Sequence, residues 1–205
     1  MGLPDEKPTR LYLIRHGEVE NSRQGKYNGH SDVELSAVGI QQFQILSERL
    51  SKEPVVSVYS SDLVRTRTGA EMIAKPFGLR VQVRKDLREK NFGNWEGLTP
   101  EQVSKQFPME WKQWLINPVD FSHLGGESYR NVFKRAVNVL TEILENNRQQ
   151  EVVIVSHGGV NRLILSYALH LDLKNINRIE QKYGALNVVD FYKDVGVIKL
   201  INGLW

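Results

Sequence analysis

Short runs of consecutive apolar residues along this chain predict buried strands. Residues 11–14 and residues 152–155 are continuously apolar, which is typical of strands covered on both faces in a parallel sheet. Residues 55–59 predict a third short strand, and residues 79–83 alternate apolar and polar positions, as a partly covered strand does. These segments predict the core of one sheet.

The last two apolar segments, residues 186–192 and 195–200, are joined through Lys193 and Asp194. Such close spacing predicts a hairpin, whose two strands run antiparallel. We expect this hairpin at the edge of the sheet.

Between the strands, apolar positions recur at the spacing of a helix. Ser36 is a favoured N-cap, and the apolar residues behind it fall on one helical face: Ile40, Phe43, Leu46 and Leu50. Residues 60–62, Ser-Ser-Asp, predict a cap and an acidic first turn for a second helix that ends near Lys75. This helix carries Arg65 and Arg67 in its opening turns.

The clearest amphipathic helix follows Ser128. Its apolar stripe consists of Tyr129, Val132, Phe133, Ala136, Val137, Leu140 and Leu144. We interpret the stripe as core packing. A further helix is expected to continue from residue 160 to residue 169, directly after the strand at 152–155.

Residues 98–125 interrupt the alternation of strands and helices. Thr99, Pro100 and Glu101 are a cap, a proline and an acid in the order that begins a helix. Two tryptophans at residues 111 and 114 predict a second short helix after Pro108. We expect this helical insertion to form a lid or side wall.

Strands that alternate with helices over 205 residues predict a single α/β domain spanning residues 1–205. Its expected architecture is a three-layer α/β/α sandwich with a mostly parallel central sheet and an antiparallel edge strand. Composition agrees with an ordinary globular protein, because 40% of residues are hydrophobic and 25% are charged.

Charge narrows the expected partners. The chain has 27 basic and 24 acidic residues and a net charge of +3, without a basic block. This balance favours a modest positive field for an anionic small molecule and argues against nucleic acid as a partner. No apolar run approaches the roughly 20 residues of a membrane span, so we expect no membrane partner.

The absence of cysteine excludes disulfides, thiolate metal sites and a cysteine nucleophile. Residues 1–10 are polar and contain Pro4 and Pro8, which does not suit a signal peptide or an amphipathic transit helix. Glu6 stands where a myristoylation motif requires Ser or Thr. We therefore expect a cytoplasmic protein.

Two of the predicted strands end in similar polar motifs. Arg15-His16-Gly17 follows one strand and Ser156-His157-Gly158 follows another. Ligands of open α/β sheets bind beyond the carboxyl ends of the strands, so the two histidines are expected to face one crevice. Either motif alone is equally consistent with polar residues that close a strand.

Arg65 adds a third charged group, near the N-terminus of a helix that already favours an anion. Neighbouring arginines repel a metal ion but grip a phosphate through paired hydrogen bonds. We therefore expect no metal and no cofactor in this crevice. The expected ligand is the phosphate of a small-molecule phosphomonoester.

A histidine beside a bound phosphate can act as a nucleophile, and nearby arginine charges favour its neutral form. The departing alkoxide then needs a proton donor. Glu89, in the charged loop at residues 87–97, is the candidate acid, with Glu18 and Glu96 as alternatives.

Five motifs in this order resemble the histidine phosphatase superfamily, the phosphoglycerate mutase-like group. They are Arg15-His16-Gly17-Glu18, Arg65 after residues 59–63, Leu87-Arg88-Glu89 with residues 92–97, Gly125-Gly126-Glu127-Ser128, and Ser156-His157-Gly158-Gly159. The resemblance covers residues 9–192.

The resemblance implies that His16 is the phosphorylated nucleophile and Glu89 the acid and base, without a metal or other cofactor. It implies that Arg15, Arg65 and His157 bind the phosphate. Residues matched to substrate contacts are Asn21, Asn28, Gly29 and Gly158. Asn21 falls one residue earlier than in the commonest spacing of the family.

Mutases of this family carry an extra segment with paired arginines and a proline pair, and residues 97–125 lack it. A metal-independent phosphoric monoester hydrolase is therefore favoured over a phosphoglycerate mutase. Residues 27–32, 90–95 and 180–187 are similar to α-ribazole phosphatases of cobalamin nucleotide-loop synthesis. A broad-specificity phosphatase of sugar and organic phosphates is an alternative. Another is a non-catalytic protein that binds phosphorylated ligands, and a homodimer is left open.

Overall fold

A computed structural model of the chain describes residues 6–193 and 195–204. Asp194, in the predicted hairpin turn, and Pro4, one of the two prolines near the N-terminus, lie outside these ranges. Six strands form one sheet in the order β3-β2-β4-β1-β5-β6. Their bounds are β1 Thr9–Arg15, β2 Val55–Ser60, β3 Val81–Val83, β4 Glu151–Ser156, β5 Leu186–Tyr192 and β6 Val195–Gly203.

The mostly parallel sheet and the antiparallel hairpin at its edge are confirmed. β1 pairs in parallel with β4, and β2 pairs in parallel with β4 and β3. β5 runs antiparallel to both β1 and β6, so it lies one position inside the edge, which β6 occupies. A tight hairpin places β6 outside β5, and sequence alone does not say which of the two pairs with β1.

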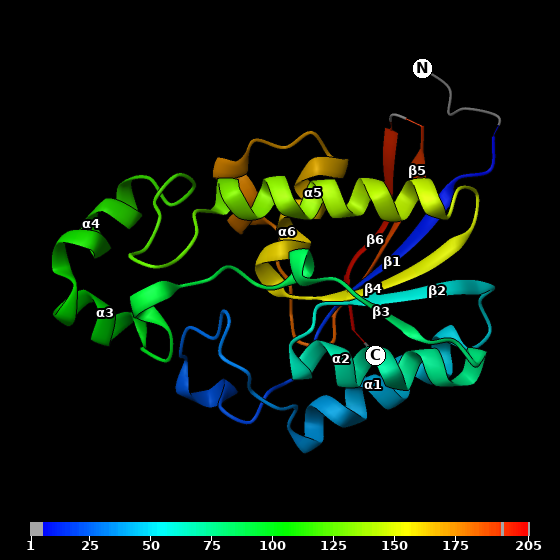
Figure 1. Ribbon diagram of the computed structural model, residues 1–205, viewed down its shortest axis with the longest axis horizontal. Helices are drawn as coiled ribbons and strands as arrows, with labels where there is room; N and C mark the ends of the chain where they lie inside the picture. Colours follow the sequence, from blue (N-terminus) through cyan, green and yellow to red (C-terminus); the bar gives the residue numbers. More distant parts are fainter. Residues whose placement is uncertain (1–5, 194, 205) are drawn as a thin grey trace.

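Helices cover both faces of the sheet, as the three-layer expectation requires (Figure 1). α1 (Ala37–Leu50) and α2 (Val64–Ala74) pack on one face, and α5 (Tyr129–Asn146) and α6 (Gly158–Ala168) pack on the other. Continuous apolar strands fit this arrangement, because residues 11–14 and 152–155 are buried on both sides. The connections contain short 3-10 turns: η1 Ser22–Gln24, η2 Lys75–Phe77, η3 Lys85–Leu87, η4 Gly93–Trp95 and η5 Leu173–Arg178.

The predicted caps Ser36 and Thr99 are confirmed, Ser128 also caps its helix, and the predicted cap of α2 was wrong. Ser36, Thr99 and Ser128 each accept a hydrogen bond from the third residue of their helix. α2 begins only at Val64, whose N–H donates to Asp32 from a distant loop at 2.8 Å.

Asp62 instead binds Arg88 through two hydrogen bonds of 2.6 Å. The cap of α2 could not be predicted because it is a tertiary contact. The stripe of α5 was predicted on its correct face but incompletely, because Val139 and Ile143 are buried and Val137 is only partly so.

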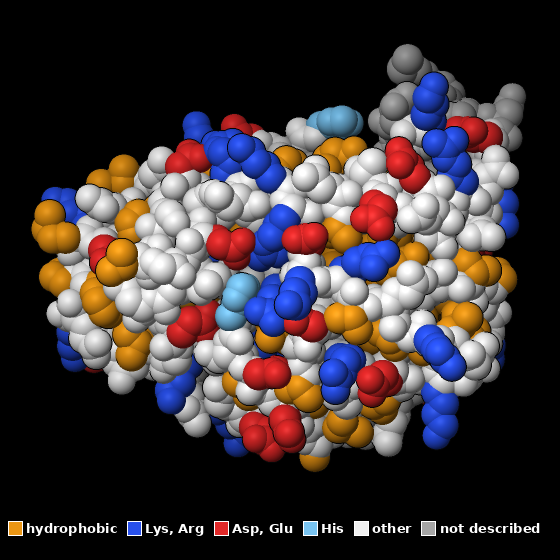
Figure 2. Space-filling model, in the orientation of Figure 1, with side chains coloured by type: hydrophobic (Ala, Val, Ile, Leu, Met, Phe, Trp, Pro, Cys, Tyr) orange, Lys and Arg blue, Asp and Glu red, His pale blue; other side chains and the backbone are white. Residues whose placement is uncertain are grey.

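The insertion contains α3 (Pro100–Gln106) and α4 (Pro108–Ile116), as predicted, on the side of the sheet where the parallel strands end (Figure 1). Apolar side chains are visible over this part of the surface (Figure 2). The exposed ones are Met109, Leu115, Ile116 and Leu124. That the insertion acts as a lid stays a prediction. None of the helices in the described ranges is long and apolar enough to cross a membrane.

Candidate active site

His16 follows β1 directly, and its ring is oriented by the main chain. Its Nδ1 lies 2.8 Å from the carbonyl oxygen of Gly17. A carbonyl can only accept, so Nδ1 carries the proton and Nε2 keeps a free lone pair. Burial, and then the charges of Arg15 and Arg65, hold the pKa of His16 well below its ordinary value. The ring is therefore a neutral imidazole with its Nε2 available as a nucleophile.

His157 meets His16 because β1 and β4 are paired. Arg15 lies opposite Ser156 in the parallel register, so the residues that follow both strands emerge side by side. The ring centroids of the two histidines are 5.3 Å apart. His157 is fully buried, its Nε2 lies 2.8 Å from Ser61 Oγ, and its Nδ1 has no partner within the described residues.

Arg65 is fully buried and is held by carbonyl oxygens of the loop after β1. Its guanidinium donates to Ser31 and Gly29 at 2.7 Å each. Arg15 donates to the carbonyl of Gln181 at 2.6 Å and lies 3.9 Å from the centroid of the Tyr183 ring. Burial lowers the pKa of both arginines.

Three buried nitrogens of the residues expected to bind phosphate lack partners among the described residues: Nε of Arg15, Nε of Arg65 and Nδ1 of His157. Buried polar groups are normally hydrogen-bonded, so such a cluster calls for a ligand. Two of the three nitrogens are cationic donors. The arrangement can hold an anion with several oxygens, beside the free lone pair of His16.

Glu89 is oriented by main-chain donors. Its two oxygens accept from the N–H groups of Lys90 at 2.8 Å and Gly159 at 2.9 Å. A Cβ at Gly159 would overlap the carboxylate, so a larger residue there would displace Glu89 from this position. Arg135 of α5 donates to the carbonyl of Glu89 at 3.0 Å and to both oxygens of Glu127. The candidate acid is thus positioned by residues from several elements.

The two alternative acids have other contacts. Glu96 accepts from the N–H groups of Gly29, His30, Ser31 and Phe92 and from the hydroxyl of Ser31. A carboxylate so fully engaged holds two loops together and has little capacity for proton transfer. Glu18 accepts from the Ser36 hydroxyl at the start of α1.

The residues matched to substrate contacts lie close to the arginines. Asn21 and Asn28 bind each other through reciprocal amide hydrogen bonds of 2.7 and 3.1 Å. Gly29 accepts from Arg65 and donates to Glu96. A Cβ at Gly158 would lie 3.3 Å from Arg15 Nε. Substrate contact by these four residues stays a prediction.

Trp95 is fully buried and packs against a group of aromatic side chains: Trp111, Trp114, Phe121 and His123. It therefore stabilises the wall formed by the insertion. Phe121 belongs to the same wall. The centroid of the Tyr129 ring lies 4.5 Å from Lys90 Nζ.

Sequence reasoning missed two buried polar side chains beside the site. Lys90 is fully buried and its Nζ has no hydrogen-bond partner in the described structure, and burial lowers its pKa to about 8. Both ring nitrogens of His123 also lack partners there, and burial lowers its pKa to about 3. The burial of Lys90 and His123 depends on tertiary packing, so no local pattern in the sequence indicates it. Glu127 and Arg135 were also missed as a pair, because Glu127 precedes α5 and its contact with Arg135, eight positions along the chain, depends on the fold.

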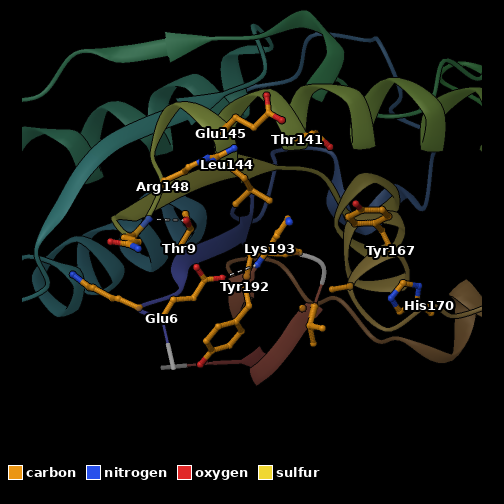
Figure 3. Close-up of a pocket in the computed structure, with 16 residues that line it drawn as sticks. Glu6, Thr9, Thr141, Leu144, Glu145, Arg148, Tyr167, His170, Tyr192 and Lys193 are labelled. Carbon is orange, nitrogen blue, oxygen red and sulfur yellow. Dashed lines mark hydrogen bonds between the residues drawn. The ribbon is translucent and has the colours of Figure 1, made fainter. Parts of the chain in front are cut away.

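A cavity of about 710 Å³ lies at the opposite end of the sheet (Figure 3). Its lining includes Thr9 at the start of β1, Tyr192 at the end of β5 and Arg148 after α5. None of the candidate catalytic residues lines this cavity. Within the described ranges, no group of three or more His, Asp and Glu side chains is arranged to hold a metal ion.

Residues 11–203 match the model of the histidine phosphatase superfamily, branch 1. The chain is 39% identical over 161 residues to phosphoglycerate mutase-like protein 4 of Arabidopsis thaliana, which covers 77% of this chain and 70% of that protein. It is 34% identical over 164 residues to phosphoserine phosphatase 1 of Hydrogenobacter thermophilus, which covers 80% and 78%. The structure of the alpha-ribazole phosphatase from Shigella flexneri superposes with a TM-score of 0.88 at 25% identity, over 95% of this chain and 96% of that one.

Proposed function

This chain belongs to the histidine phosphatase superfamily, and on that premise we propose that it hydrolyses phosphomonoesters through a phosphohistidine at His16. The observation that carries this proposal is the orientation of His16, whose Nδ1 is held by Gly17 while Nε2 is free. The free Nε2 belongs to a ring that lies against His157, next to the unpartnered nitrogens of two arginines.

In the first step, Nε2 of His16 attacks the phosphorus in line with the ester oxygen. Arg15, Arg65 and His157 bind the phosphoryl oxygens and stabilise the charge that develops on them. The bond between phosphorus and the ester oxygen breaks. The departing oxygen takes its proton from Glu89, which then carries the negative charge.

In the second step, water attacks the phosphorus of phospho-His16. Glu89 now takes a proton from that water, so the same carboxyl group serves first as acid and then as base. The bond between His16 and phosphorus breaks, and inorganic phosphate leaves. His16 returns to the neutral form that its buried, arginine-rich surroundings favour.

The test is turnover and phosphoenzyme formation in His16→Ala. We expect the variant to lose hydrolysis of para-nitrophenyl phosphate. After rapid quenching of a reaction with a substrate radiolabelled in its phosphoryl group, the wild type should carry the label as an acid-labile phosphohistidine, and the variant should not. His170→Ala is the matched control, because His170 lines the cavity at the far end of the sheet. Retention of most activity by His16→Ala, with His170→Ala unchanged, would contradict the proposal.

For the substrate, we propose α-ribazole 5'-phosphate. The proposal is supported by the similarity of residues 27–32, 90–95 and 180–187 to that subfamily and by the superposition on the Shigella flexneri enzyme. Phosphoserine is the second candidate, because the phosphoserine phosphatase of Hydrogenobacter thermophilus is 34% identical over 80% of the chain.

The two candidates are separated by kcat/KM on a panel of substrates. The panel contains α-ribazole 5'-phosphate, phosphoserine, phosphoglycerates, sugar phosphates and nucleoside monophosphates. We expect α-ribazole 5'-phosphate to exceed the others by about tenfold or more. Similar values across the panel would instead indicate a broad-specificity phosphatase, and transfer of the phosphoryl group to a phosphoglycerate would indicate a mutase.

A further inference from the structure

The phosphate ligand His157 ends a buried chain of two hydroxyl groups. Its Nε2 lies 2.8 Å from Ser61 Oγ, and Ser61 Oγ lies 2.7 Å from Thr66 Oγ1. Thr66 Oγ1 in turn lies 2.9 Å from the carbonyl oxygen of Leu63. All three side chains are fully buried, so water does not compete for these hydrogen bonds.

The direction of the chain follows from its last acceptor. A hydroxyl has one proton, and a carbonyl can only accept. If Thr66 donates to Leu63, Thr66 can accept from Ser61, and Ser61 can then accept from His157 Nε2–H. This direction makes three hydrogen bonds, whereas the reverse direction makes only two. The N–H of Leu63 also donates to Ser61 Oγ, at 3.3 Å, which occupies its second lone pair.

This direction determines the tautomer of a neutral His157. With the proton on Nε2, Nδ1 carries a lone pair and is the ring atom that lacks a partner. A lone pair repels the oxygens of a phosphate dianion. To donate to phosphate while still bound to Ser61, the ring must gain a second proton.

We propose that Ser61 and Thr66 are positioning residues that hold His157 in the Nε2–H form, so that binding of a phosphate dianion takes up one proton at Nδ1. This inference rests on the proposed function. The proton comes from solvent when phosphate binds and returns to solvent when phosphate leaves, so the cycle is balanced.

The charged groups around His157 agree with proton uptake only in the complex. Without phosphate, burial lowers the pKa of His157 well below its ordinary value, and Arg65, His16, Arg135 and Arg15 lower it further. A bound dianion reverses the sign of the local charge and favours the imidazolium. Affinity for the dianion should consequently fall by about tenfold for each unit of rising pH.

The experiment measures the proton directly. In ¹⁵N NMR spectra of the wild type near pH 8, His157 should show a protonated Nε2 and an unprotonated Nδ1. Saturation with inorganic phosphate, which is mainly the dianion at that pH, should protonate both nitrogens. Calorimetry in buffers of different ionisation enthalpy should report uptake of about one proton for each phosphate bound.

Thr66→Val is the decisive variant, because valine matches threonine in shape but removes the acceptor of the Ser61 proton. Ser61 should then donate to His157 Nε2, and His157 should become the Nδ1–H tautomer that binds phosphate with almost no proton uptake. Thr66→Ser keeps the hydroxyl and should behave as the wild type. Ser61→Ala, which frees the ring from its fixed acceptor, should also reduce the uptake.

An Nδ1–H tautomer in the free wild type would overturn this inference without affecting the proposed function. Phosphate binding without proton uptake would do the same. Unchanged proton uptake in both Thr66→Val and Ser61→Ala would also overturn the inference. Failure of His16→Ala to reduce turnover would instead contradict the proposed function. The two failures are therefore distinguishable.

Discussion

The carboxylate of Glu89 accepts a hydrogen bond of 2.9 Å from the N–H of Gly159, two residues after His157. This contact ties the proposed acid to the start of α6 and to a proposed phosphate ligand. A second N–H, from Lys90, holds the other carboxylate oxygen. The proposed proton donor and the proposed phosphate site are thus fixed relative to each other before a substrate binds, as efficient proton transfer requires.

Replacement of the proposed acid should affect substrates according to their leaving group. Glu89→Ala should reduce kcat for an alkyl phosphate by about 10²- to 10⁴-fold. It should affect para-nitrophenyl phosphate far less, because nitrophenolate scarcely needs a proton. The measurement is kcat on both substrates in the wild type and in Glu89→Ala. Equal losses on both would remove Glu89 from the acid role.

Arg135 should matter for stability and for the position of Glu89. It pairs with Glu127 and donates to the carbonyls of Arg88 and Glu89. Arg135→Met leaves the partly buried Glu127 unpaired and should lower the free energy of unfolding by about 3 kcal/mol. The measurement is urea unfolding, together with kcat on an alkyl phosphate, which should also fall.

The matched control for Arg135 is Arg130→Met. Arg130 lies on the same helix and pairs with Asp120 at the surface, where both side chains are largely exposed. Exposed ion pairs contribute little to stability, so we expect no measurable change. Equal stability of the wild type and Arg135→Met would show that the pair with Glu127 is not needed to hold the loop.

Glu96 should contribute to substrate binding without taking part in the chemistry. Its five donors join the loop at residues 29–31 to Phe92, and that loop supplies the carbonyls that hold Arg65. Glu96→Gln should therefore raise KM several-fold and lower the free energy of unfolding by about 2 kcal/mol. Glu101→Gln, at an exposed ion pair on α3, is the control and should change neither quantity.

Lys90 should make stability depend on pH. Burial lowers its folded pKa from 10.5 to about 8, so the unfolded chain binds more protons between these values. Stability should rise with pH through this window, and below pH 8 the buried charge costs about 3 kcal/mol. Lys90→Met should thus be more stable than the wild type below pH 8, and the difference should shrink toward pH 10.5.

The measurement for Lys90 is the free energy of unfolding of both proteins at several pH values. Lys112→Met, on the exposed face of α4, is the control and should show no such trend. A constant difference between the wild type and Lys90→Met across the pH range would show that the amine is not desolvated in the folded protein.

Much of the architecture could be predicted because the signals are local. The buried strands β1 and β4 are continuous apolar runs, and Ser36, Thr99 and Ser128 cap helices within their own first turns. The start of α2 could not be predicted, because Asp32 reaches it from a separate loop. The place of β5 inside the edge depends on its pairing with β1, which is again a long-range contact.

The sequence by itself determined the candidate residues, since residue type and spacing are local properties that set the chemistry available at each strand end. Only the tertiary structure decided how those residues differ. Glu89 and Glu96 lie in one loop and are chemically identical, but the fold brings five donors to Glu96 and only two main-chain donors to Glu89. Likewise, the pairing of β1 with β4 brings His16 and His157 together, because register between distant strands is set by the whole packed sheet.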